Sequence, residues 1–252
     1  MKLRRSFSSQ QLIFALGLTL SFATMAAAQD KLTTKDNRTQ DGKIIGVVGS
    51  SVQIQVGAGT IGVPLATVQS VTMATPPEFA TGKAAYEAGD YVKALAPIKA
   101  VADKFKGLPT LWAQEATSLL GNVYVALNKL PEAEAAYLDF QKSYGAQGGS
   151  IQSDVGLARV ALSKKDYDKA KEKLEPITAR ALTEKHPAPA LATTYSQAFY
   201  LLAQVEEAQQ DYPAALQNYL RTVTLFHHDS VSAAGAQEKA NALRKAHNIA
   251  VP

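Results

Sequence analysis

Four stretches of the chain, set at nearly regular intervals, share one order of residue types. Each has an alanine, a small residue twelve positions before it and a large apolar residue four positions after it. The alanines, which lie 39, 37 and 45 residues apart, are Ala94, Ala133, Ala170 and Ala215. The small residues are Gly82, Gly121, Ala158 and Ala203, and the large ones are Ile98, Tyr137, Leu174 and Tyr219. A period of this length is typical of stacked supersecondary units, which constrains the fold more than any other feature of the sequence.

The residue types within each stretch predict two short helices that pack tightly against each other. A Gly or Ala on the first helix lets the second helix, with its alanine facing it, approach closely. Gly89 and Asn128 can end a first helix, because both tolerate the left-handed conformation that closes many helices. Each second helix begins with an N-terminal cap or with a proline in its first turn, at Asp90, Asp166, Asp211, Pro131 and Pro213. We therefore expect four helix pairs.

The chain from residue 76 to 252 resembles the tetratricopeptide repeat family. The second stretch, "LLGNVYVALNKLPEAEAAYLDF", carries the resemblance best, with its matching positions at Leu120, Gly121, Tyr124, Ala133 and Tyr137. The resemblance implies a mainly α fold, a right-handed helical solenoid of four pairs whose first helices line a concave face. A last helix, from about Val231 to Ala246, has no partner in this scheme and is expected to cap the array.

A different period precedes the helices, over residues 41–75. In "SVQIQV", Val52, Ile54 and Val56 alternate with glutamines, as in a half-buried strand. Four such runs, separated by short breaks, predict a small four-stranded antiparallel β module that resembles SH3-like or Sm-like barrels. A sheet this small is marginal alone, so we expect it to pack on the helices or on a copy of itself. The prolines of "ATPPEF" mark its boundary with the repeats.

The first 28 residues have the three parts of a secretory signal peptide. Lys2, Arg4 and Arg5 precede an apolar run, which ends in three alanines at 26–28. Cleavage near Ala28 would export the protein, and we expect a periplasmic location. Residues 29–40, "QDKLTTKDNRTQ", are polar and are interpreted as a linker.

Charge and cysteine content exclude several classes of function. Residues 1–28 hold three of the 26 basic residues and none of the 22 acidic ones, so the remaining chain has a net charge of about +1. A nearly neutral chain lacks the general electrostatic attraction for nucleic acid. The chain has no cysteine, hence neither disulfides nor a thiolate nucleophile.

No residue pattern predicts a catalytic, cofactor or metal site. "HHD", which comprises His227, His228 and Asp229, could offer ligands to a metal-dependent hydrolase, but adjacent residues point in different directions. We interpret this segment as a helix cap. The pairs Glu132/Glu134 and Glu206/Glu207 are expected on solvated helix faces, and the recurring tyrosines in the packed interior. The sequence thus favours a protein without enzymatic activity.

The predicted concave face is the remaining candidate site. Counting from each small residue, the family's concave positions form a polar row flanked by aromatic rings. This partner-binding set comprises Lys83, Tyr86, Asn122, Arg159, Tyr200 and Gln204. Arg159 is the expected contact for an anionic group of a peptide or protein partner. Two alternatives stay open: a structural envelope protein that self-associates through its β module, and a periplasmic protein that binds a small ligand or glycan.

Overall fold

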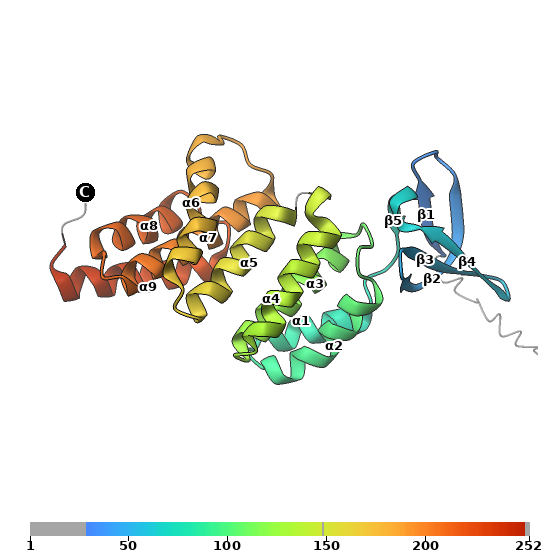
Figure 1. The fold of residues 1–252 in the computed structure, drawn as a ribbon, viewed down its shortest axis with the longest axis horizontal. Helices are drawn as coiled ribbons and strands as arrows, with labels where there is room; N and C mark the ends of the chain where they lie inside the picture. The colour runs from blue at the N-terminus through green and yellow to red at the C-terminus, as the bar shows by residue number, and fades with distance from the viewer. Residues whose placement is uncertain (1–28, 148, 250–252) are drawn as a thin grey trace, which may run out of the picture.

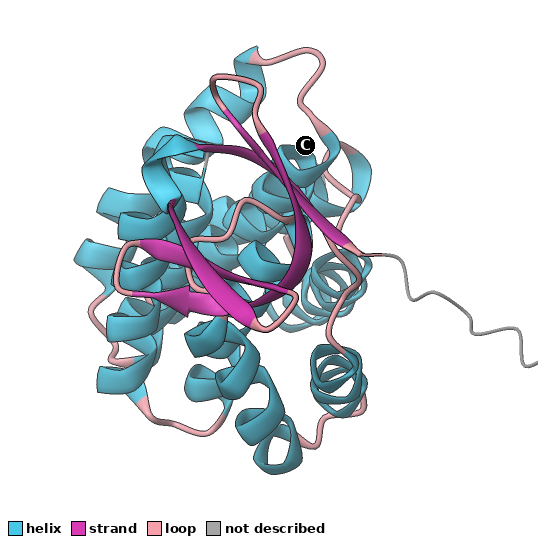
Figure 2. Cartoon of the chain, turned by 90° about the vertical axis from the view of Figure 1, so that its right-hand side faces the viewer, coloured by secondary structure: helices cyan, strands magenta, loops and turns pink. Residues whose placement is uncertain are grey.

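The structure is a computed structural model that describes residues 29–147 and 149–249. Within these ranges the chain forms nine α-helices and five β-strands (Figures 1 and 2). The molecule is elongated, with the strands at one end and the last helix at the other (Figure 1). The predicted signal peptide, residues 1–28, lies outside the described residues.

The strands form one antiparallel sheet in the order β4-β3-β2-β1-β5. They are β1 (Asp30–Thr34), β2 (Thr39–Val48), β3 (Ser51–Val56), β4 (Gly59–Pro64) and β5 (Val68–Thr72), with a 3₁₀ turn, η1 (Leu65–Thr67), before the last. The long β2 pairs with β1 through its first part and with β3 through the remainder. A register shift between Ile44 and Gly46 marks a bulge after this change of partner, and the sheet curls on itself (Figure 2).

Two predictions about this module are wrong: it has five strands instead of four, and residues 29–40 are not a linker. β1 and the start of β2 occupy that segment. Leu32 is fully buried, and the Asp30 carboxylate accepts a hydrogen bond from the Ile44 N–H at 2.9 Å. The sequence hides β1 because its other side chains are polar and only Leu32 is buried. The other four predicted strands are confirmed as β2 to β5.

The helices follow as four consecutive pairs and one further helix. They are α1 (Pro77–Glu87), α2 (Tyr91–Lys104), α3 (Leu111–Ala126), α4 (Leu130–Tyr144), α5 (Gly149–Ser163), α6 (Tyr167–Thr183), α7 (Pro189–Ala208), α8 (Tyr212–Thr224) and α9 (Ser230–His247), with a 3₁₀ turn, η2 (Gly145–Gln147), after α4. Each helix packs against the next one, and α5 also packs on α3 and α7. The array is therefore two helices deep along its length (Figure 1).

The turns inside the four pairs use the same local chemistry. Each contains a residue with positive φ, between 56° and 78°; these are Gly89, Asn128, Lys165 and Gln210. The cap prediction is confirmed at three turns, where Asp90, Asp166 and Asp211 accept a backbone N–H three residues ahead at 3.1–3.3 Å. Each such cap stabilises its helix by about 1 kcal/mol. The remaining connection, between α3 and α4, has no such cap, and Pro131 lies in the first turn of α4.

Glycines of the first helices make room for large side chains. A Cβ atom on Gly82 would lie 2.7 Å from Ile98, and one on Gly121 would lie 2.6 Å from the Tyr137 ring. The nearest side chain to each of these glycines is not the alanine of the second helix. The residue four positions after that alanine fills the space. The Tyr137 ring also fills the space beside Gly156 of the next pair, where a Cβ would come within 2.3 Å.

The β module and the first helices share one core. Leu32 and Ile54 of the sheet belong to the same cluster of buried side chains as Phe79 and Phe105. The turn before α3 touches η1 directly, because a Cβ on Gly107 would lie 2.7 Å from Leu65. The module therefore packs on the helical array, as its small size predicts.

Candidate functional site

The predicted partner-binding residues lie on the first helices α1, α3, α5 and α7, which we call the first-helix face. Lys83 of α1 is not free, because its ammonium forms an ion pair with Glu115 of α3 at 2.5 Å. Both side chains are about half exposed. This pair ties α1 to α3 and leaves Lys83 without an uncompensated charge to offer.

Asn122 of α3 holds the central tyrosine of the array. Its Oδ1 atom accepts a hydrogen bond from the Tyr137 hydroxyl at 2.6 Å. Tyr137 is buried, and burial raises its pKa to about 12. Asn122 thus satisfies a buried hydroxyl that would otherwise cost about 1–3 kcal/mol.

Arg159 of α5 is different from the other members of the set. Its Nε atom is buried and has no hydrogen-bond partner. Among the described residues, the same is true of Trp112 Nε1. The Arg159 guanidinium forms no ion pair with any residue of the described ranges, although the side chain is half-buried. A cation that is partly removed from water without a counter-charge favours an anionic ligand.

Other groups of the face converge on Arg159. Tyr86 of α1 is half-buried, and burial raises its pKa, while the positive charge of Arg159 opposes that rise. The same charge acts on the buried hydroxyl of Tyr137, and Asp229, just before α9, also acts on Tyr86. The structure therefore brings Tyr86, Asn122 and Arg159 together around Tyr137, from three first helices that are far apart in the sequence.

Tyr200 and Gln204 of α7 lie at the other end of the face. Tyr200 packs on the last helix: a Cβ on Gly235 of α9 would lie 2.5 Å from its hydroxyl. Its ring is 5.9 Å from that of Tyr219. Gln204 is half-buried. Packing thus accounts for Tyr200, and the group around Arg159 is the stronger candidate for binding.

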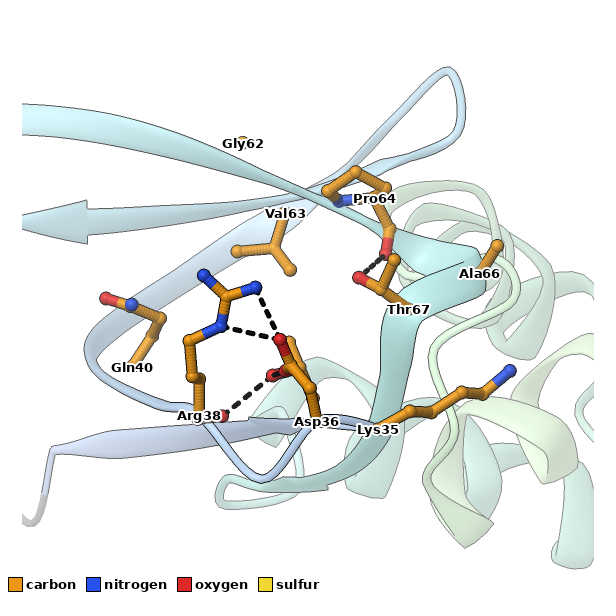
Figure 3. Close-up of a pocket in the computed structure, with 10 residues that line it drawn as sticks. Lys35, Asp36, Arg38, Gln40, Gly62, Val63, Pro64, Ala66 and Thr67 are labelled. Carbon is orange, nitrogen blue, oxygen red and sulfur yellow. Dashed lines mark hydrogen bonds and ion pairs between the residues drawn. The ribbon is translucent and has the colours of Figure 1, made fainter.

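A cavity lies in the β module (Figure 3). This cavity of about 550 Å³ is bounded by the β1–β2 turn on one side and by β4 and η1 on the other. Its guanidinium group is already satisfied, because Arg38 Nε donates to Asp36 at 2.6 Å. Thr34 donates to the same carboxylate, and these bonds lower the pKa of Asp36 to about 2. The arginine of this cavity is therefore paired, unlike Arg159.

Glu206 of α7 corrects another expectation, since it does not lie on a solvated face. It is only 7% exposed, and the side-chain amide of Asn218 donates to both of its carboxylate oxygens at 3.0 and 2.8 Å. Burial raises the pKa of Glu206. Its neighbour Glu207 accepts a hydrogen bond from the Tyr219 hydroxyl at 2.6 Å. Both carboxylates thus join α7 to α8.

His227 and His228 lie beside the residue that caps α9, Asp229. Asp229 accepts the backbone N–H of Ser232 at 3.1 Å and caps α9, as predicted, while the exposed rings of His227 and His228 stack 5.1 Å apart. Among the described residues, no group of three or more His, Cys, Asp or Glu side chains could hold a metal ion. Within the same ranges, no helix combines the length and the hydropathy that a membrane span needs.

No family model matches the chain, and no curated protein is similar enough to serve as a relative. The assignment of the site therefore depends on the geometry and on the sequence pattern. Sequence reasoning found Arg159 but missed Gly156, which lies two residues before the predicted small position, Ala158. A search for glycines at helix-contact spacing from Tyr137 could have found it.

Proposed function

We propose that this protein is an exported, non-enzymatic interaction scaffold of the bacterial cell envelope. It binds a partner peptide or protein on the first-helix face, the predicted concave face of a tetratricopeptide-type array. The single observation that carries the proposal is the uncompensated guanidinium of Arg159 on that face. The export and the periplasmic location rest on the signal pattern of residues 1–28.

The ligand class follows from the chemistry around Arg159. A guanidinium is planar and binds a carboxylate through two parallel hydrogen bonds, which are stronger than neutral ones. Tyr86 adds a half-buried phenol beside it. An acidic side chain or a terminal carboxylate of a peptide fits this combination best.

The rigidity of the face supports binding. Asn122 fixes Tyr137, and the Lys83–Glu115 ion pair ties α1 to α3 across the face. A face that is already ordered loses little conformational entropy when a partner docks, so a few contacts suffice for useful affinity.

The test compares affinity capture from the periplasm by the wild-type protein and by Arg159→Met. This substitution keeps most of the aliphatic stem and removes the charge. We expect the wild-type protein to retain a partner that Arg159→Met loses. A synthetic peptide from the recovered partner should then bind the wild type, and neutralising its carboxylates should weaken binding by about tenfold or more, as loss of a charge-assisted contact implies.

Arg244→Met provides the matched control. Arg244 is an exposed arginine on the last turn of α9, away from α1, α3 and α5. It should capture the partner as well as the wild type does, and thermal unfolding should show that both variants are folded. A partner retained equally by Arg159→Met would overturn the proposal.

A further inference from the structure

A long segment of the β module carries no charge. Residues 44–77, which include the second half of β2 and all of β3, β4 and β5, contain no Lys, Arg, Asp, Glu or His. The segment also exposes several large apolar side chains, at Ile45, Val48, Val56 and Ile61. Centres of protein interfaces are depleted of charge, and free edge strands usually carry lysines that prevent pairing. This surface lacks that protection.

β4 is the edge strand at one side of the sheet, since β3 is its single neighbour in the described chain. None of its six residues is fully buried. Its free edge offers backbone hydrogen-bonding groups, which is the template for pairing with another strand. Two features limit the length of this edge, the turn at 57–58 and the proline at position 64.

The direction of the backbone groups of β4 follows from one hydrogen bond. The Leu65 N–H donates to the Ser50 carbonyl at 2.7 Å, which continues the β3–β4 ladder. Residues of an antiparallel strand turn their N–H and C=O groups alternately toward the two sides. The backbone N–H and C=O groups of the odd-numbered residues of β4 therefore point toward β3, and those of Thr60 and Gly62 point toward the free edge. Pro64 belongs to the outward series, where its missing N–H breaks no bond within the sheet.

We propose that β4 pairs antiparallel with β4 of a second copy, about a two-fold axis at Ile61. In this register Thr60 of each copy lies opposite Gly62 of the other. All outward N–H and C=O groups of Thr60 and Gly62 are then paired, giving four hydrogen bonds. The two Ile61 side chains, each 41% exposed, lie side by side on the face that carries buried Ile54.

A second copy fits this edge for two reasons. Its own edge is uncharged, so the two strands meet without like-charge repulsion or the cost of burying an ion. The pairing is also self-complementary, as a two-fold interface requires, and it uses the β4 edge of both copies, so β4 pairing stops at the dimer. The contact is short, so we expect a dimer that dissociates on dilution.

The test measures molar mass by sedimentation equilibrium over a range of concentrations, on the full chain as purified from cells. The wild type should pass from monomer to dimer as the concentration rises. Ile61→Lys should raise the dissociation constant at least about tenfold, because like charges then face each other across the axis. Gln55→Lys is the matched control: it adds the same charge at an exposed position of β3, on the opposite face of the sheet from Ile61, and should dimerise like the wild type.

A charge swap tests the register. Ile61→Glu and Ile61→Lys should each be monomeric alone and form a mixed dimer together. In the wild type, hydrogen exchange of the Thr60 and Gly62 amides should slow as the concentration rises, which tests the pairing even if a variant fails to fold. A wild type that stays monomeric, equal dimerisation of Ile61→Lys and Gln55→Lys, or an extended segment of a different protein bound at β4 would overturn the assignment.

Discussion

The β module and the helical array both bury apolar side chains, but they differ in the sequence distance of their contacts and in their charge. In the array, each pair repeats a local pattern, and charged side chains are paired across its surface, as between Lys83 and Glu115. In the module, strands distant in sequence meet, β1 with β5 above all, and residues 44–77 carry no charge. The comparison teaches that the array is specified by local signals, whereas β1 of the module forms through contacts that no local signal reveals.

The largest expected effect tests that dependence in the module. Leu32→Ala removes a fully buried side chain from β1, which lies between β2 and β5 and shares the core with α1 to α3. We expect the free energy of unfolding, measured with urea and circular dichroism, to fall by about 2–5 kcal/mol. The exposed neighbour Lys31 supplies the control, and Lys31→Ala should change it by less than about 0.5 kcal/mol. Equal effects of both substitutions would mean that β1 is peripheral to the core.

The next effect concerns the packing between pairs of the array. Gly156→Ala places a Cβ atom 2.3 Å from the Tyr137 ring, which is buried and held by Asn122. The ring has no room to move, so we expect a loss of about 1–3 kcal/mol in the free energy of unfolding. Gly235→Ala is the control, since its Cβ meets the hydroxyl end of half-buried Tyr200, which can shift. If Gly235→Ala lost as much stability, the tight fit at Tyr137 would not be special.

The smallest expected effect is a difference between the array and the module in how their stability depends on pH. Burial raises the folded-state pKa of Glu206 above its ordinary value of 4.5, so its contribution to stability is present below that value and is lost as the pH rises through the folded pKa. Glu206→Gln removes this loss. We expect the difference in melting temperature, variant minus wild type, to become more positive between pH 4 and pH 7.

The pKa of Asp36 in the module is shifted in the opposite direction from that of Glu206. Its pKa is lowered to about 2, so its contribution is present above its ordinary value of 3.8 and is lost as the pH falls toward 2. It therefore leaves the interval from pH 4 to 7 unchanged. Glu238→Gln, on the exposed face of α9, is the control for Glu206→Gln. A melting-temperature difference that is independent of pH would show that Glu206 is not perturbed by burial.

Much of the helical array could be predicted because its signals are local. Caps such as Asp90 and Asp211 depend on residues three positions apart, and the helical period is visible within single segments. β1 could not be predicted in this way, since its single buried side chain gives no period. The positive φ angles at Lys165 and Gln210 were likewise hidden, because neither residue type favours that conformation.

The candidate site was predictable only as a set of positions. Repeat spacing placed Asn122 and Arg159 on first helices, but it could not show that Lys83 is paired and Arg159 is not. That distinction depends on Glu115, which lies 32 residues from Lys83 in the sequence. The burial of Glu206 depends in the same way on α8, which carries Asn218.

The Tyr137 ring has a consequence for how such a chain can be inherited. It lies against glycines of two successive pairs, Gly121 of its own and Gly156 of the next. A duplication or deletion that separates these pairs would leave either an empty slot beside a glycine or a ring without space. We therefore expect duplications, deletions or recombination events that preserve the fold to keep the second and third pairs adjacent.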